Sequence, residues 1–142
     1  MDTSPLPLAA MGLLPHAGTM CCIDRLLTST KTMAVAEVVL EGNHSLLDGD
    51  TLAPAGCVEL AAQTAGALQG FDRQRQNLPP QHGYLVGAQD FAVCGTATVG
   101  DRLEVEVHIE AEFAEVTVLS AKVSRGETVL ATGRIKVYVR EN

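Results

Sequence analysis

Positively charged residues are scarce in this sequence. Ten lysines and arginines stand against 17 aspartates and glutamates, so the formal net charge is −7 at pH 7. A surface with this charge repels nucleic acid, whose phosphates are bound mainly by lysine and arginine. No basic cluster is interleaved with aromatic side chains, of which the chain has only two tyrosines, three phenylalanines and no tryptophan. The sequence therefore argues against a nucleic-acid-binding protein.

The sequence also lacks the segments that direct a protein into or across a membrane. No lysine or arginine precedes Arg25, whereas a signal peptide opens with a positively charged region. No apolar run approaches the roughly 20 residues that a membrane-spanning helix needs. We therefore expect neither an export signal nor a membrane span, and a cytoplasmic protein.

Paired cysteines are a third absence. The cysteines are Cys21, Cys22, Cys57 and Cys94, and none belongs to a Cys-x-x-Cys pair. Each stands among apolar residues, which is typical of reduced thiols in a core rather than of disulfides or zinc ligands. We expect no metal site.

The remaining composition indicates one ordinary folded domain. Of the 142 residues, 46% are hydrophobic and 19% are charged, which is too apolar for a disordered chain. A chain of this length usually builds one hydrophobic core, and no repeat or linker divides it. The sequence predicts a single domain over residues 1–142.

The spacing of apolar residues predicts one long helix followed mainly by strands. The helix is expected from Pro54 to about Gly70, because proline suits a first helical turn. After Asp101, apolar residues at odd positions alternate with glutamates, which indicates a half-buried strand. Further strands are expected at residues 33–40, 84–91, 115–124 and 128–140, and a turn with a short helix at 13–27. The fold class is therefore α+β, with a curved antiparallel sheet wrapped around one central helix whose small residues permit close packing.

Glu59 is out of place in this helix. It lies between Val58 and Leu60, which indicate a helix buried nearly all round, and a buried charge without a partner is costly. Gln63 follows one turn later on the same face. The two residues form a narrow polar stripe, and we expect the functional site there.

Three stretches of the sequence occur in a recognisable order. They are Leu13-Leu-Pro-His-Ala-Gly-Thr-Met-Cys-Cys-Ile-Asp-Arg-Leu-Leu27, then 54–66 with Glu59 and Gln63, and then Tyr84-Leu-Val-Gly-Ala-Gln-Asp-Phe91 followed by Val99-Gly-Asp-Arg-Leu-Glu-Val-Glu-Val107. Together they resemble the hotdog-fold 3-hydroxyacyl-[acyl-carrier-protein] dehydratases, lyases that remove water from 3-hydroxyacyl thioesters. The chain is most similar to the divergent dehydratases of aryl-polyene-type biosynthetic clusters. The resemblance implies the hotdog fold, a place in fatty-acid or polyene biosynthesis, and no cofactor.

The resemblance also implies residue roles. In these enzymes a histidine removes a proton from C2, backbone N–H groups at the helix N-terminus polarise the thioester carbonyl, and a carboxylic acid protonates the departing C3 hydroxyl. Glu59 matches the acid, and His44 lies within a residue of the position expected for the base. Gln63 would orient Glu59 or line the acyl tunnel. The candidates for the carbonyl contact are the N–H of Gly56 together with that of Ala55 or Cys57.

The loop that carries His44 departs from the family pattern. The usual His-Phe-Pro-Gly is replaced by His44-Ser-Leu-Leu, and the usual Pro-Gly before the helix by Pro54-Ala55. His16, in the first stretch, is the second candidate for the base. In the resembling enzymes the histidine of one protomer meets the acid of the other. This implies a homodimer or higher multiple, or a heteromer with a related hotdog chain, acting on an acyl carrier protein or coenzyme A thioester.

Two other functions remain open at this point. The first is a hotdog acyl thioesterase, in which Glu59 would activate water or attack the thioester. The second is a catalytically silent acyl-binding or partner subunit. A thioesterase releases free acid and thiol, whereas a silent subunit binds without turnover.

Overall fold

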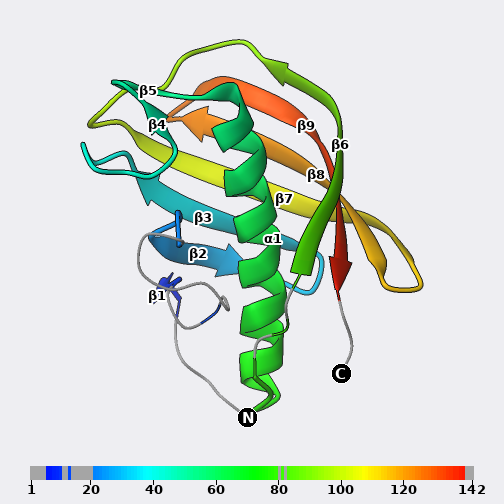
Figure 1. Ribbon diagram of the computed structural model, residues 1–142. Coiled ribbons are helices and arrows are strands. Elements are labelled where there is room, and N and C mark those ends of the chain that lie inside the picture. The colour runs from blue at the N-terminus through cyan, green and yellow to red at the C-terminus, as the bar shows by residue number, and fades with distance from the viewer. Residues whose placement is uncertain (1–5, 11–12, 14–20, 80, 82, 140–142) are drawn as a thin grey trace.

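A seven-stranded antiparallel sheet curves around one side of a single long helix in the computed structural model (Figure 1). The structure describes residues 6–10, 13, 21–79, 81 and 83–139. The strands of the sheet lie in the order β1-β2-β3-β7-β8-β9-β6, and β4 pairs with β5 in a separate hairpin. The elements are β1 (Leu8–Ala9), β2 (Arg25–Ser29), β3 (Met33–Val39), β4 (Leu47–Asp48), β5 (Thr51–Leu52), α1 (Pro54–Arg75), β6 (Gly83–Val93), β7 (Arg102–Phe113), β8 (Val116–Arg125) and β9 (Thr128–Val139). The predicted architecture is confirmed, although strand β2 begins within residues 13–27, which were expected to form a turn and short helix.

Helix α1 begins at Pro54, as predicted, but runs past Gly70 to Arg75. Two residues after the helix, Asn77 adopts a left-handed conformation with φ 60°. The N–H of Leu78 donates to the Arg73 carbonyl and that of Asn77 to the Gln74 carbonyl, which is the Schellman pattern that closes many helices. The stop signal is therefore Asn77, not Gly70.

Gly70 has a different purpose. A Cβ at this position would lie 1.8 Å from the carbonyl oxygen of Leu13, so the helix and the main chain of Leu13 touch there. Leu13 itself is fully buried. Glycine is required because only a residue without a side chain permits this approach.

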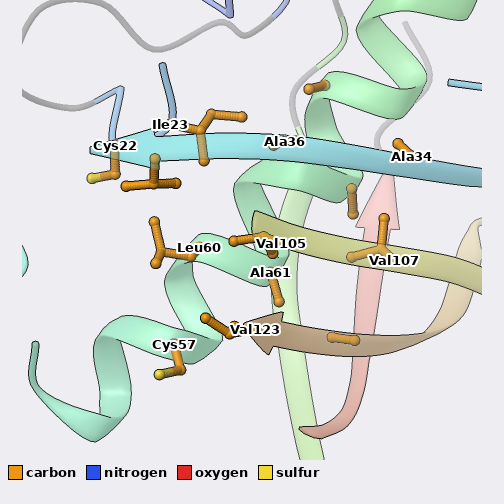
Figure 2. Close-up of a cluster of buried hydrophobic side chains, with 14 of the residues drawn as sticks. Cys22, Ile23, Ala34, Ala36, Cys57, Leu60, Ala61, Val105, Val107 and Val123 are labelled. Atoms are coloured by element: carbon orange, nitrogen blue, oxygen red, sulfur yellow. The ribbon is translucent and has the colours of Figure 1, made fainter. Parts of the chain in front are cut away.

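The core lies between α1 and the inner face of the sheet. Figure 2 shows Leu60 and Ala61 of the helix beside Val105 and Val107 of β7 and Val123 of β8. The predicted alternation of β7 is confirmed up to Ile109, where a bulge shifts the register with β8. Alanines 34, 36, 61, 65 and 67 are buried in this layer, so small residues bring the helix close to the sheet.

Among the described strands, β6 forms one edge of the sheet and pairs only with β9. Its exposed apolar side chains include Tyr84, Leu85, Val86 and Val93, each between 43% and 58% exposed. A long edge with apolar side chains is a surface on which another strand can pair. No helix in the described part of the chain is long and apolar enough to cross a membrane.

Candidate functional site

Glu59 lies on the second turn of α1, on the side that the sheet does not cover. It is half-buried, as are its neighbours Val58 and Ala62, whereas Leu60 and Ala61 on the sheet side are fully buried. The expectation that the helix is buried nearly all round was therefore wrong, because the sheet encloses only one side of it. Among the described residues the Glu59 carboxylate forms no hydrogen bond or ion pair. Its oxygens are available to a ligand or another chain.

His44 is held at both ring nitrogens by main-chain groups. Nδ1 lies 3.2 Å from the N–H of Leu46, and Nε2 lies 2.8 Å from the carbonyl oxygen of Cys22. A backbone N–H can only donate and a carbonyl can only accept, so Nδ1 carries the lone pair and Nε2 carries the proton. The half-buried imidazole is thus fixed as one neutral tautomer.

The loop around His44 is itself fastened to its surroundings. The N–H of His44 donates to the Glu41 carbonyl at 2.9 Å, and the His44 carbonyl accepts from Leu47 at 3.2 Å. The β4–β5 hairpin follows, and the N–H of Leu52 donates to the Ala97 carbonyl at 2.9 Å. This hairpin leads directly into α1, so the sequence that carries His44 also sets the start of the helix.

The first turn of α1 has no side-chain cap. Ala53 occupies the N-cap position, and the N–H of Gly56 donates to its carbonyl at 2.8 Å. Ala55 is exposed in the same turn, where an N–H has no carbonyl one turn earlier within the helix to accept from it. A Cβ on Gly56 would lie 2.7 Å from Leu52, so the hairpin packs closely on this turn. Of the N–H groups predicted to contact a thioester, that of Gly56 is engaged, which leaves Ala55 as the stronger candidate.

Cys57 lies in the same turn and is buried. A cysteine at a helix N-terminus can act as a nucleophile when it is a thiolate. Burial, however, raises the pKa of the Cys57 thiol. This favours a packing role for Cys57.

Gln63 is buried, and its amide oxygen accepts a hydrogen bond of 2.7 Å from the N–H of Cys22. The sequence suggested that Gln63 orients Glu59 or lines a tunnel. That role stays a prediction. In the structure, the amide oxygen of Gln63 and the ring of His44 meet at the main chain of one residue, Cys22. No local pattern in the sequence indicates this meeting point, because Cys22 is 41 residues from Gln63 and 22 from His44. His16, the second candidate for the base, lies outside the described residues.

The Asp24-Arg25 pair of the first stretch holds strands together. A carboxylate oxygen of Asp24 accepts from the N–H of Val39 at 2.7 Å, and Arg25 donates to Glu37 at 2.8 and 3.1 Å. Arg102 of β7 donates to the second oxygen of Glu37 at 3.1 Å. The hydrogen bond from Arg25, with the charges of both arginines, holds the pKa of the Glu37 carboxyl below its ordinary value despite burial. This motif is structural, because it joins β2, β3 and β7.

Comparison with known proteins identifies the family. A family model described as ApeP dehydratase, of the ApeP-like family, matches residues 8–142. The chain belongs to the ApeP-like dehydratase family. The predicted resemblance to dehydratases of aryl-polyene-type clusters is thereby confirmed, while a search of curated proteins gave no significant match.

Solved structures confirm the hotdog fold. The dehydratase heterocomplex ApeI:P from Xenorhabdus doucetiae superposes with a TM-score of 0.87 at 20% identity, covering 95% of this chain and 93% of that chain. The uncharacterized protein PH1136 from Pyrococcus horikoshii gives 0.70 at 16% identity, with 97% of each chain covered. The protein smu.793 from Streptococcus mutans UA159, bound to acetyl CoA, gives 0.62 at 11% identity, with 82% of this chain and 88% of that chain covered.

Proposed function

We propose that this chain takes part in the dehydration of a 3-hydroxyacyl thioester, carried on acyl carrier protein, to the trans-2-enoyl thioester in fatty-acid or polyene biosynthesis. The observation that carries the proposal is Glu59. In a chain of a dehydratase family it presents, one turn after the helix N-terminus, a half-buried carboxyl group that pairs with none of the described residues. The helix N-terminus stabilises the negative charge that develops on the thioester carbonyl. An acid is needed near it, because the departing C3 hydroxyl lies two carbons from that carbonyl and must be protonated to leave as water.

The reaction divides between a base and an acid. Nδ1 of His44 takes the proton from C2, and the electrons of that C–H bond form the C2–C3 double bond. Glu59 donates its proton to the C3 hydroxyl as the C–O bond breaks, so the hydroxyl leaves as water. The N–H of Ala55 donates to the thioester carbonyl. Transfer of the proton from His44 back to Glu59 through solvent restores the starting state.

The hydrogen bonds of His44 are compatible with a base. Donation from Nε2 to the Cys22 carbonyl orients the ring and leaves the lone pair on Nδ1. The contact of Nδ1 with the Leu46 N–H, at 3.2 Å, is at the long end of the range for such bonds. Substrate would displace this weak contact, and catalytic hydrogen bonds commonly tighten only when substrate is present.

The proposed site needs a second chain. The free edge of β6 and its exposed apolar side chains offer a surface for a strand of another hotdog chain. A second chain over the half-buried side of α1 would also shield Glu59 from water. A homodimer satisfies this requirement. A heteromer with a related hotdog chain does so too, and the similarity to a protein described as a dehydratase heterocomplex supports it.

Turnover of defined thioesters tests the proposal. Wild type, His44→Ala, Glu59→Gln and the control Gln69→Ala are incubated with 3-hydroxyacyl thioesters of acyl carrier protein and of coenzyme A, and products are identified by mass spectrometry. We expect wild type and the control to remove one water from the carrier-bound substrate, and both site variants to lose this activity. Release of free acid would indicate a thioesterase instead. Binding without any conversion would indicate a silent subunit, and light scattering on the same samples reports whether the chain self-associates.

A further inference from the structure

Two buried or half-buried side chains converge on the main chain of Cys22 from separate parts of the fold. Gln63 extends from the buried face of α1, and its amide oxygen accepts a hydrogen bond of 2.7 Å from the Cys22 N–H. His44 reaches it from the loop after β3 and donates from Nε2 to its carbonyl oxygen at 2.8 Å. Cys22 is 7% exposed and Gln63 4%, so water competes little for these bonds.

The two hydrogen bonds connect Gln63 to His44 through Cys22, and we call this chain of contacts the relay. The Gln63 amide oxygen fixes Cys22, and Cys22 fixes the Nε2 proton of His44. We propose that Gln63 is a positioning residue, which acts through Cys22 to hold the imidazole of His44 in its Nε2-protonated orientation. The inference rests on the proposed function in one respect, because it is the role of His44 as base that makes this orientation matter for catalysis.

The opposite tautomer is disfavoured at both ends of the ring. A proton on Nδ1 would face the N–H of Leu46, and the lone pair then left on Nε2 would face the carbonyl of Cys22. Both contacts would change from attractive to repulsive. The relay therefore selects the tautomer only while the Cys22 carbonyl stays in place. Cys22 lies outside the named strands, so Gln63 supplies an anchor that strand pairing does not.

The relay also ties the base to helix α1 of its own chain. Gln63 lies one helical turn after Glu59 on α1, which is a rigid element of 22 residues. His44 lies on a loop. Because Gln63 ties the segment that holds His44 to α1, it constrains the placement of the base relative to the helix of its own chain.

Three variants separate positioning from general packing. Gln63→Met preserves length but removes the acceptor oxygen. Gln63→Glu keeps an acceptor for the Cys22 N–H, and Gln69→Met makes the same amide-to-thioether change at a half-buried position of the same helix. Nitrogen chemical shifts of the His44 ring, assigned by their loss in His44→Ala, report the tautomer without any reference to activity.

We expect wild type, Gln63→Glu and Gln69→Met to show a protonated Nε2 and an unprotonated Nδ1, and Gln63→Met to show a mixture of tautomers. With carrier-bound substrate, kcat should fall about tenfold in Gln63→Met while KM changes less than about twofold, and Gln63→Glu should restore most of kcat. Ring shifts in Gln63→Met that equal those of wild type would overturn the inference. If Gln63→Met does not fold, Gln63→Asn shortens the side chain, which moves the amide oxygen away from the Cys22 N–H while keeping the amide group. The nitrogen shifts of the His44 ring are then compared between this variant and wild type. If Gln63→Met changes the tautomer but wild type does not dehydrate the substrate, the relay is upheld and the proposed function is refuted. If wild type dehydrates the substrate but Gln63→Met keeps the wild-type tautomer, the proposed function is upheld and the relay is refuted.

Discussion

Two glutamates of this chain have opposite surroundings. Glu37, on the face of the sheet away from α1, is 8% exposed and receives hydrogen bonds from Arg25 and Arg102. Glu59, on the uncovered side of the helix, is half-buried and has no partner among the described residues. A carboxylate whose oxygens are occupied by arginines stabilises a structure, whereas one that is shielded and unoccupied is available for chemistry. The comparison separates a structural carboxylate from a candidate acid, and substitutions at each can test it.

The largest expected effect is on activity, at Glu59. Replacing it with glutamine removes the proton donor and keeps the shape, so the dehydration rate should fall by about 10² to 10⁴. The free energy of unfolding should change by less than about 0.5 kcal/mol, because the carboxylate has no hydrogen bond or ion pair with the described residues to lose. Urea unfolding and single-turnover dehydration measure the two quantities. A large loss of stability with full activity per folded molecule would reverse the roles assigned to the two glutamates.

The next effect is on stability, at Glu37. Glu37→Gln leaves Arg25 and Arg102 without their countercharge, although both arginines are partly exposed and water compensates part of the loss. We expect a loss of about 1 to 2 kcal/mol in the free energy of unfolding, measured with urea, and unchanged kcat. Glu104→Gln is the matched control, since Glu104 lies opposite Glu37 in β7 but is exposed. Equal losses in both variants would show that the arginine pairs contribute little.

The dependence of stability on pH sharpens the same contrast. The arginines lower the pKa of Glu37 in the folded state from its ordinary value of 4.5. A lowered pKa means that the stabilisation is complete above the pKa of the unfolded chain and is lost as pH falls through that of the folded protein. The stability difference between wild type and Glu37→Gln should therefore be constant near neutrality and shrink below about pH 4.5. Urea unfolding at a series of pH values measures it, and a difference that stays constant into acid would contradict the assignment.

The contrast between the two glutamates also explains what the sequence could reveal. Glu59 was recognisable because its apolar neighbours are adjacent in the chain, and the alternation of β7 was readable for the same reason. The pairing of Glu37 was not, since Arg25 and Arg102 come from different strands, 12 and 65 residues away. The same limit applies to the end of α1, where Gly70 is explained by contact with Leu13. Short-range patterns thus predicted the fold, whereas contacts between distant segments determined the surroundings of the candidate site.

The smallest expected effects are on stability, in two hairpin turns that contain neither Glu37 nor Glu59. Substitutions there change stability without touching the proposed catalytic groups, so they serve as a baseline. Ala114, between β7 and β8, has φ 57°, and Gly126, between β8 and β9, has φ 59°. A side chain disfavours this left-handed conformation, so Ala114→Gly should stabilise the protein by about 0.5 to 1 kcal/mol. A Cβ at Gly126 would meet no atom within 4 Å, so Gly126→Ala should cost a similar amount through backbone strain alone. Thermal unfolding measures both changes, and kcat should stay constant in each. A change in kcat that follows stability in this pair would mean that the rate loss in Glu59→Gln cannot be assigned to the missing proton alone.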